Sequence, residues 1–159
     1  MRFTVEETVE KYKDRLFAVA LNVTKDIDDA DDAVQEAFIS YYKSSMDFES
    51  ENHIKAWLIR VTVNKAKDIS SSFWKRHRQS LEEYKESLVF IQPEDSNLFD
   101  AVMALPEKYR VAIHLFYYEE YSVKEISEIL NEKESTVKSH LSRGRMFLKE
   151  MLKEEWNND

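Results

Sequence analysis

Hydrophobic residues recur at intervals of three and four through most of this chain, which is the spacing of amphipathic helices. Such stripes run through residues 5–23, 30–41, 54–69, 98–105, 109–117, 126–130 and 137–152. An acidic, weakly periodic stretch at 79–96 separates the first three from the rest. One Gly and two Pro are too few for a sheet with many tight turns. The pattern predicts an all-α protein with two small helical domains, at 1–78 and 97–159, joined by a flexible linker at 79–96.

Capping residues mark where several of these helices begin and end. A capping box, a Ser or Thr followed three residues later by Glu, begins at Thr4 and again at Ser122. Asn131 stands where a helix would stop in the left-handed conformation that Asn tolerates. Residues 122–149 are therefore predicted to form a short helix, a tight turn and a longer helix. This is the helix-turn-helix pattern, whose second helix enters the major groove of DNA.

The polar face of that second helix is basic and rich in small hydroxyls. Between 133 and 149, five Lys and Arg residues stand against one Glu, a balance of +4 in a chain whose formal net charge is -8. The alternative is a charged face that is only solvated and binds no partner. The local reversal of charge favours a polyanion partner. The DNA-facing residues are predicted to be Thr136, Lys138, Ser139, His140, Ser142, Arg143 and Arg145.

A second basic stretch lies at 65–78, where five Lys and Arg residues stand against one Asp and Phe73 and Trp74 are interleaved. This composition suits single-stranded or melted nucleic acid. The preceding loop, SMDFESEN, contains the isolated aromatic Phe48. Its ring either folds back onto the core or stacks on an unstacked base.

Carboxylates cluster at the start of the second predicted helix, where caps and the helix dipole favour them. A calcium loop counted from Asp26 would need Gly at Asp31 and a bidentate Glu at Ala37, so the spacing excludes it. No His or second acidic cluster supports a hydrolase site. The exposed side of the helix carries Asp32, Gln35 and Glu36. Plain capping and a docking face for a basic partner both remain open.

Composition restricts the class of protein further. Hydrophobic residues make up 43% of the chain, enough for packed cores. Cysteine is absent, which excludes disulfides and Cys-based zinc sites and is consistent with a reducing cytoplasm. Neither a signal peptide nor an apolar stretch of about 18 residues is present, so no membrane insertion is expected. We expect a cytoplasmic protein with no metal or cofactor. Its net charge weakens binding to free DNA, so a partner should supply part of the affinity.

Two pairs of segments, in order, resemble a known family. DADDAVQEAFISYY followed by IKAWLIRVTVNKAKD resembles sigma region 2, and LPEKYRVAIHLFYYEEYSVKEISEIL followed by STVKSHLSRGR resembles sigma region 4. The chain is similar to bacterial extracytoplasmic-function RNA polymerase sigma factors, the short kind with those two domains. The resemblance implies a specificity subunit, not an enzyme, which delivers RNA polymerase to a promoter and melts it. An anti-sigma factor is implied as a further partner.

The resemblance also assigns roles to residues, in three sets. Docking on the β′ clamp helices of the polymerase core falls to Asp32, Gln35, Glu36 and Phe38. Capture of a flipped −10 base and its single strand falls to Phe48, Asn64, Lys67, Lys75 and Arg76. Recognition of the −35 element falls to Thr136, Lys138, Ser139, His140, Ser142, Arg143 and Arg145.

The sequence departs from the family pattern at several positions. The turn at 131–133 is Asn-Glu-Lys, where the family usually has Gly, an aliphatic residue and Ser. His140 stands where the family usually has Arg, which predicts a shifted −35 preference. The aromatic run at 116–118 is expected to be core. STVKSHL also occurs in response-regulator output domains, so a stand-alone helix-turn-helix regulator with an N-terminal sensing or dimerisation domain is the alternative. The second basic stretch and the acidic face count against it.

Overall fold

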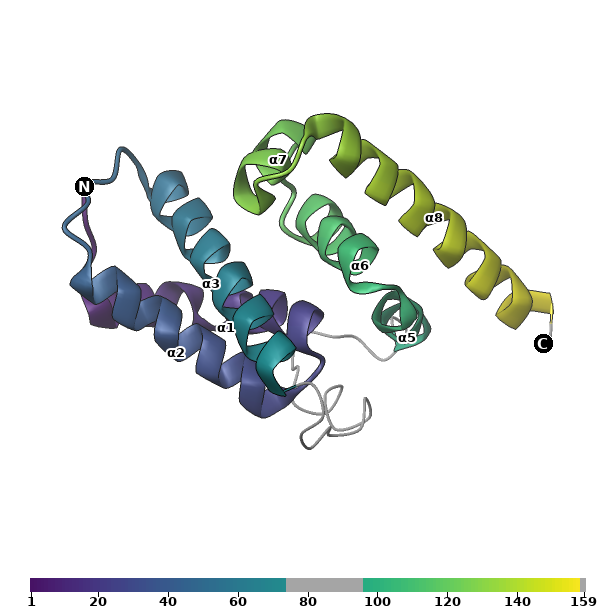
Figure 1. The fold of residues 1–159 in the computed structure, drawn as a ribbon, viewed down its shortest axis with the longest axis horizontal. Helices are drawn as coiled ribbons and strands as arrows, with labels where there is room; N and C mark the ends of the chain where they lie inside the picture. Colours follow the sequence, from purple (N-terminus) through teal and green to yellow (C-terminus); the bar gives the residue numbers. More distant parts are fainter. Residues whose placement is uncertain (74–95, 158–159) are drawn as a thin grey trace. The chain divides into compact units, whose positions relative to one another are not determined.

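The computed structural model describes residues 1–73 and 96–157, and every regular element in these two ranges is helical (Figure 1). The described residues belong to two compact units, one within 1–78 and the other within 79–159. The all-α prediction is confirmed. Lys75, Arg76 and nearly all of the expected linker at 79–96 lie outside the described residues.

The first unit is a bundle of three helices: α1 (Val5–Thr24), α2 (Ile27–Lys43) and α3 (Glu51–Phe73). Each of the three packs against the other two, as Figure 1 shows. The predicted stripes supply the core, because their residues share one face of each helix. Its largest fully buried side chains are Leu16, Leu21, Tyr41, Phe48, Ile54, Leu58 and Ile59.

Local side-chain bonds set the ends of α1 and the start of α2. The Oγ1 of Thr4 accepts a hydrogen bond of 3.1 Å from the backbone N–H of Glu7. Lys25 ends α1 in the left-handed conformation, with φ 56°. The Oδ1 of Asp26 then accepts from the N–H of Asp29 at 2.9 Å and caps α2. The capping of both helices by these side chains is confirmed, and α2 follows α1 after a two-residue turn.

The second unit contains α5 (Ser96–Ala104), α6 (Glu107–Ile113), a π-helical turn η2 (His114–Tyr118), α7 (Val123–Leu130) and α8 (Glu134–Asn157). Helices α5, α6 and α7 all pack against α8 (Figure 1). Pro106 precedes the first turn of α6, where its missing N–H costs nothing. The largest fully buried side chains here are Met103, Leu115, Ile126 and Leu141. Helix α8 is therefore supported by three shorter helices.

The π turn η2 changes which aromatic side chains are buried. The N–H of Glu119 donates to the carbonyl of His114 at 3.2 Å, a bond five residues back along the chain. The turn therefore holds more residues than the 3.6 of an α-helix, and the side chains after it change face. Tyr117 and Tyr118 are 55% and 54% exposed. The prediction that the run at 116–118 is core is wrong for these two tyrosines.

The turn between α7 and α8 has the capping that the sequence predicts. Ser122 and Glu125 form a reciprocal capping box at the start of α7, with hydrogen bonds of 3.1 and 2.9 Å. Asn131 ends α7 with φ 54° and ψ 49°, the left-handed stop. The N–H of Glu132 then donates to the carbonyl of Ser127 at 2.9 Å. Asn131 thus takes the left-handed position at the helix end that a glycine usually fills.

Candidate nucleic-acid interface

Helix α8 presents a largely polar face to solvent, on which Met146 is the exposed apolar exception among the described residues. Val137 and Leu141 are buried against the other helices of the second unit. Because successive residues of a helix are about 100° apart, the opposite side of α8 carries the predicted DNA-facing residues. Among them, Lys138, Ser139, Ser142 and Arg143 are exposed, and so is Arg145. Two cations beside two small hydroxyls can reach phosphates and base edges together.

His140 does not belong to this exposed face. Its side chain is 15% exposed, and its ring meets that of Tyr109 edge-on, with 5.6 Å between the centroids. Its Nδ1 lies 3.5 Å from the Oε2 of Glu132. Position 140 lies on the flank of α8 that packs toward α6, and a contact of His140 with DNA stays a prediction. Thr136 is half-buried, on the same flank.

Arg143 and Arg145 point to different neighbours. A hydrogen bond from Arg143 lowers the pKa of the Tyr109 phenol, so the guanidinium of Arg143 lies close to α6. The Nε of Arg145 donates to the Oη of Tyr117 at 2.6 Å. Its guanidinium carbon also lies 5.5 Å from the ring centroid of Phe116. Arg145 is exposed, but it is directed toward η2 rather than to the centre of the polar face.

An apolar groove of about 540 Å³ lies beside Arg145 in the second unit. Its walls come from α5, from the end of α6 with η2, and from α8. The apolar lining includes Leu98, Val102, Ile113, Tyr117 and Leu148, and the cations Arg145 and Lys149 border it. The sequence analysis missed this groove because it placed Tyr117 in the core. The exposure of Tyr117 depends on η2, which no hydrophobic spacing signals.

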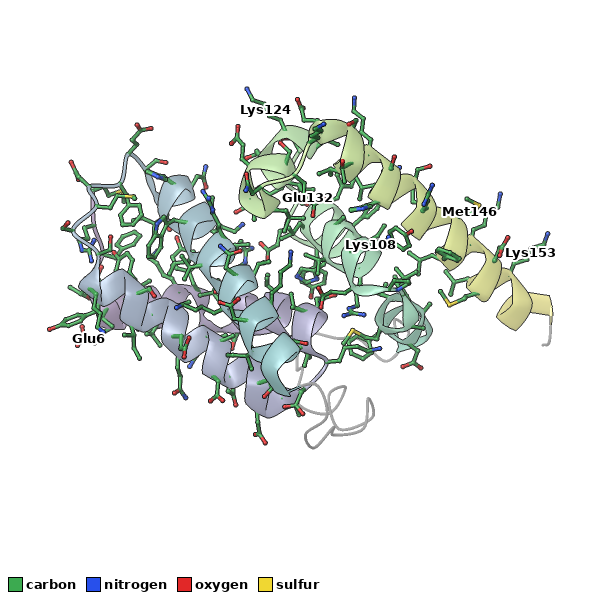
Figure 2. The ribbon with its side chains drawn as sticks, in the orientation of Figure 1. Glu6, Lys108, Lys124, Glu132, Met146 and Lys153 are labelled. Atoms are coloured by element: carbon green, nitrogen blue, oxygen red, sulfur yellow. The ribbon has the colours of Figure 1, made fainter. Side chains whose placement is uncertain are left out.

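In the first unit, α2 exposes the acidic face that the sequence predicts. Asp32, Gln35 and Glu36 are exposed, opposite a stripe that includes the fully buried Ala33 and Ala37. Figure 2 shows the side chains that project from this helix. The Oε2 of Glu36 lies 3.8 Å from the Nζ of Lys65 on α3, so the acidic face adjoins the basic end of α3.

Phe38, a member of the predicted docking set, is buried, and two other residues extend the exposed face of α2. Phe38 is only 8% exposed because position 38 lies on the core stripe of α2. Ile39 and Tyr42 are instead 51% and 72% exposed. They follow Gln35 by four and seven residues, so they lie on the same face. The i, i+4, i+7 spacing was available in the sequence, but large apolar residues are assigned to the core by default.

Phe48 adopts the first of its two predicted arrangements, the one in the core. Its side chain is 2% exposed, and its ring stacks on Tyr41 with a centroid distance of 5.7 Å and an interplanar angle of 21°. The rings of His53 and Trp57 meet it edge-on at 5.1 and 5.6 Å. Stacking on a base needs an open face, which the packed ring does not offer here, so the role of Phe48 at the −10 element stays a prediction. Among the other predicted −10 contacts, Asn64 is exposed and Lys67 is half-buried on α3.

Arg2 holds the Phe48 loop closed, a contact that sequence reasoning missed. It donates one hydrogen bond to the carbonyl of Met46 at 3.2 Å and another to the carbonyl of Tyr41. Its guanidinium carbon lies 4.4 Å from the centroid of the Tyr41 ring. Backbone carbonyls accept these bonds, so no residue type in the loop could have signalled them.

Comparison with known proteins identifies the two units. Residues 8–79 match the family model for sigma-70 region 2, and residues 96–148 match the one for sigma-70, region 4. The ECF RNA polymerase sigma factor SigW of Bacillus subtilis is 29% identical, over 93% of this chain and 88% of that protein. The chain belongs to the extracytoplasmic-function sigma factor family.

Further likenesses extend over the whole length of this sigma factor. The ECF RNA polymerase sigma factor SigM of Bacillus subtilis is 27% identical, over 98% of this chain and 99% of that protein. Among solved structures, the sigma factor RpoE in complex with the anti-sigma factor NepR from Bartonella quintana matches with a TM-score of 0.67. It is 25% identical, with 93% of this chain and 96% of that chain covered. The match to region 2 favours a sigma factor over the stand-alone regulator.

None of the helices in the part of the chain that the structure describes is both long enough and apolar enough to cross a membrane.

Proposed function

We propose that this protein is an alternative sigma factor that binds RNA polymerase core, directs it to specific promoters and melts the −10 element. One observation carries the proposal: both sigma-70 regions match in order, each on a separate compact unit with its own polar face. A stand-alone regulator would have no need of sigma-70 region 2. The protein has no catalytic activity of its own and acts in the cytoplasm, where the polymerase meets the chromosome.

The exposed face of α2 is the proposed contact with the β′ clamp helices of the core. It combines the polar side chains of Asp32, Gln35 and Glu36 with the apolar ones of Ile39 and Tyr42. Such a mixture suits a protein interface, in which aromatic anchors are surrounded by polar contacts. The carboxylates give this face the sign that a basic partner helix would complement. Phe38 supports this face from below and does not contact the partner.

The exposed face of α8 is the proposed reader of the −35 element. Arg143 is exposed and can donate two bonds to a guanine edge. Lys138, Ser139 and Ser142 supply donors for phosphates or further base edges. Arg145 donates its Nε to Tyr117, which leaves its other guanidinium nitrogens for a DNA phosphate at the edge of the major groove.

The exposed side of α3 is the proposed contact with the melted −10 strand. Asn64 and Lys67 lie on this helix, and Lys75 and Arg76 follow it along the chain. Asn64 can pair with a base edge, while the cations hold the backbone of a single strand. Because Phe48 is packed in the core, its part is to shape the loop before α3. Unstacking a base costs a few kcal/mol, which these contacts must recover.

An anti-sigma factor is the proposed regulatory partner. A related sigma factor of the same two-domain length was solved in complex with one. The apolar groove of the second unit offers a contact site for an apolar segment of such a partner, with Arg145 and Lys149 at its border for an acidic flank. A partner bound there would lie next to the −35 face and could block it.

Run-off transcription with purified core polymerase tests the proposed function. The full chain should bind core and start transcripts from a promoter that core alone does not use. The result that would contradict the proposal is a chain that neither binds core nor supports initiation, yet binds an operator tightly by itself. That outcome would establish the stand-alone regulator instead.

A further inference from the structure

Two residues at which the sequence departs from the family pattern meet in space across the α7–α8 turn. Glu132 lies in the turn, and His140 lies on the second turn of α8. The Nδ1 of His140 is 3.5 Å from the Oε2 of Glu132. Their side chains are 15% and 25% exposed. Glu132 is labelled in Figure 2, at the end of α7.

Each of these two atoms depends on the other. Both are buried, and neither makes a hydrogen bond with any described residue, so the 3.5 Å contact between them is an ion-pair contact and not a hydrogen bond. A carboxylate oxygen that is removed from water without a partner is costly. The imidazole nitrogen is the group at ion-pair distance from it in the described parts of the chain. The contact therefore offsets part of the cost of burying that carboxylate oxygen.

The contact connects α7 and α8, whose relative orientation the turn alone would leave adjustable. The backbone N–H of Glu132 donates to the carbonyl of Ser127, in the last turn of α7. Its side chain reaches forward to α8. On its other side, the His140 ring is held by the edge-on contact with Tyr109 of α6. Glu132 and His140 together thus link α7, α8 and α6 at the point where the recognition helix begins.

We propose that His140 is a positioning residue, which braces the α7–α8 turn through Glu132 and so orients the α8 face toward the −35 element. The inference rests on the proposed function, since it concerns how that face meets DNA. The angle between the two helices of a helix-turn-helix decides how the second lies in the groove. His140 contributes to promoter recognition without touching a base, whereas the sequence alone suggested an altered base contact.

A double-mutant cycle in the full chain tests the brace without DNA or polymerase. The variants are His140→Ala, Glu132→Ala and the pair, read out by hydrogen exchange of amides in 123–149, which reports on the second unit. The two substitutions should be non-additive, with the opening constant of the double variant about two- to tenfold below the product of the single effects. Glu128 is exposed on α7 and serves as the matched control. A cycle of Glu128→Ala with His140→Ala should show no coupling.

Initiation on templates that differ only in the −35 element tests the orienting role. His140→Ala should lower transcript yield by a similar factor on every template, and Glu132→Ala should do the same. His140→Asn keeps a donor near the position of Nδ1 and should restore most of the yield. The proposal is overturned if the coupling is no larger than in the Glu128 control, if His140→Ala changes the order of preferred templates, or if Asn does no better than Ala. Wild-type initiation on the same templates tests the proposed function separately.

Discussion

The Nε of Arg145 donates a hydrogen bond of 2.6 Å to the phenol oxygen of Tyr117, which connects the recognition helix α8 to the π turn η2. Both partners are exposed, and both line the apolar groove. Two residues earlier, Arg143 lies near the phenol of Tyr109, whose pKa it lowers. The two arginines of the SRGR sequence therefore serve different surfaces, although the sequence places them side by side.

Single substitutions of the two arginines should separate these surfaces. Arg143→Ala should lose about 1–3 kcal/mol of promoter affinity and relax the preference at one −35 position, because a base contact is removed. Arg145→Ala should weaken binding to all −35 sequences alike and leave the preference unchanged. Selection from a −35 library by polymerase reconstituted with each variant measures both effects. A relaxed preference in Arg145→Ala would place that side chain at a base edge instead.

Removing the polar centre of the α2 face should uncouple core binding from DNA binding. The double substitution Gln35→Ala with Glu36→Ala should weaken core binding about tenfold or more, since interface hot spots cost upwards of ~1 kcal/mol each. Core pull-down measures this loss, and DNA binding by the second unit should not change. Glu6→Ala with Glu10→Ala, at exposed positions of α1, is the matched control. If both core and DNA binding failed together, the defect would be one of folding.

Phe48 and Tyr42 are two aromatic residues of the first unit whose substitution should affect different properties, stability for Phe48 and core binding for Tyr42. Phe48→Ala should lower the free energy of unfolding of the first unit by about 3–5 kcal/mol, because it empties a buried aromatic cluster. Tyr42→Ala should change it by no more than about 0.5 kcal/mol, since the side chain is 72% exposed. Tyr42→Ala should instead weaken core binding. Denaturant unfolding checks the first two values. A Phe48→Ala variant of full stability that failed only to melt promoters would return Phe48 to a base-stacking role.

The features that sequence predicted correctly are those decided by neighbouring residues. The capping at Ser122, the left-handed stop at Asn131 and the exposed side of α8 each depend on a few adjacent positions. Helical periodicity also predicts which side of α2 carries the acidic residues. These interactions form within one or two turns, so the order of residues is enough to specify them.

The features that sequence missed depend on partners that are distant or on a change of helical period. His140 was assigned to the DNA face because its neighbours are basic, but Tyr109 and Glu132 draw it to the flank. The exposure of Tyr117 follows from the π turn, which a 3.6-residue period cannot represent. Phe38 was assigned to an exposed face despite its position on the core stripe, and the structure places it with that stripe.

Gly144 is the chain's one glycine, and the space around it predicts the effect of adding a methyl group. A Cβ at this position would lie 2.9 Å from the Cγ1 and 3.2 Å from the Cδ1 of Ile113. Alanine gains about 1 kcal/mol of helix propensity. Overpacking costs about 1–3 kcal/mol, so Gly144→Ala should destabilise the second unit. Denaturant unfolding should also show that Ile113→Ala with Gly144→Ala costs less than the sum of the two single variants. An additive result would mean that α6 and α8 separate to accommodate the methyl group.

His114 makes the stability of the second unit depend on pH. Burial lowers the pKa of this imidazole from about 6.5 to about 4. The folded state therefore disfavours the charged ring, and below pH 6.5 the unfolded chain binds more protons than the folded one. The neutral His114 ring therefore leaves the free energy of unfolding at its full value above pH 6.5, and this free energy falls as the pH drops toward 4. The loss should reach about 3 kcal/mol, at about 1.4 kcal/mol for each pH unit of the shift.

The variant His114→Gln isolates this contribution from that of the carboxylates. Its second unit should lose little stability between pH 6.5 and 5, where wild type loses most strongly through the histidine and carboxylates have barely begun to titrate. Hydrogen exchange of amides in 123–149 measures the second unit, and amides of α1–α3 serve as the internal control, since the substitution lies outside them. If wild type and variant had the same slope over this range, the His114 ring would have to accept a proton while the second unit remained folded. It would then be less enclosed in solution than its packing against Tyr118, with ring centroids 5.0 Å apart, indicates.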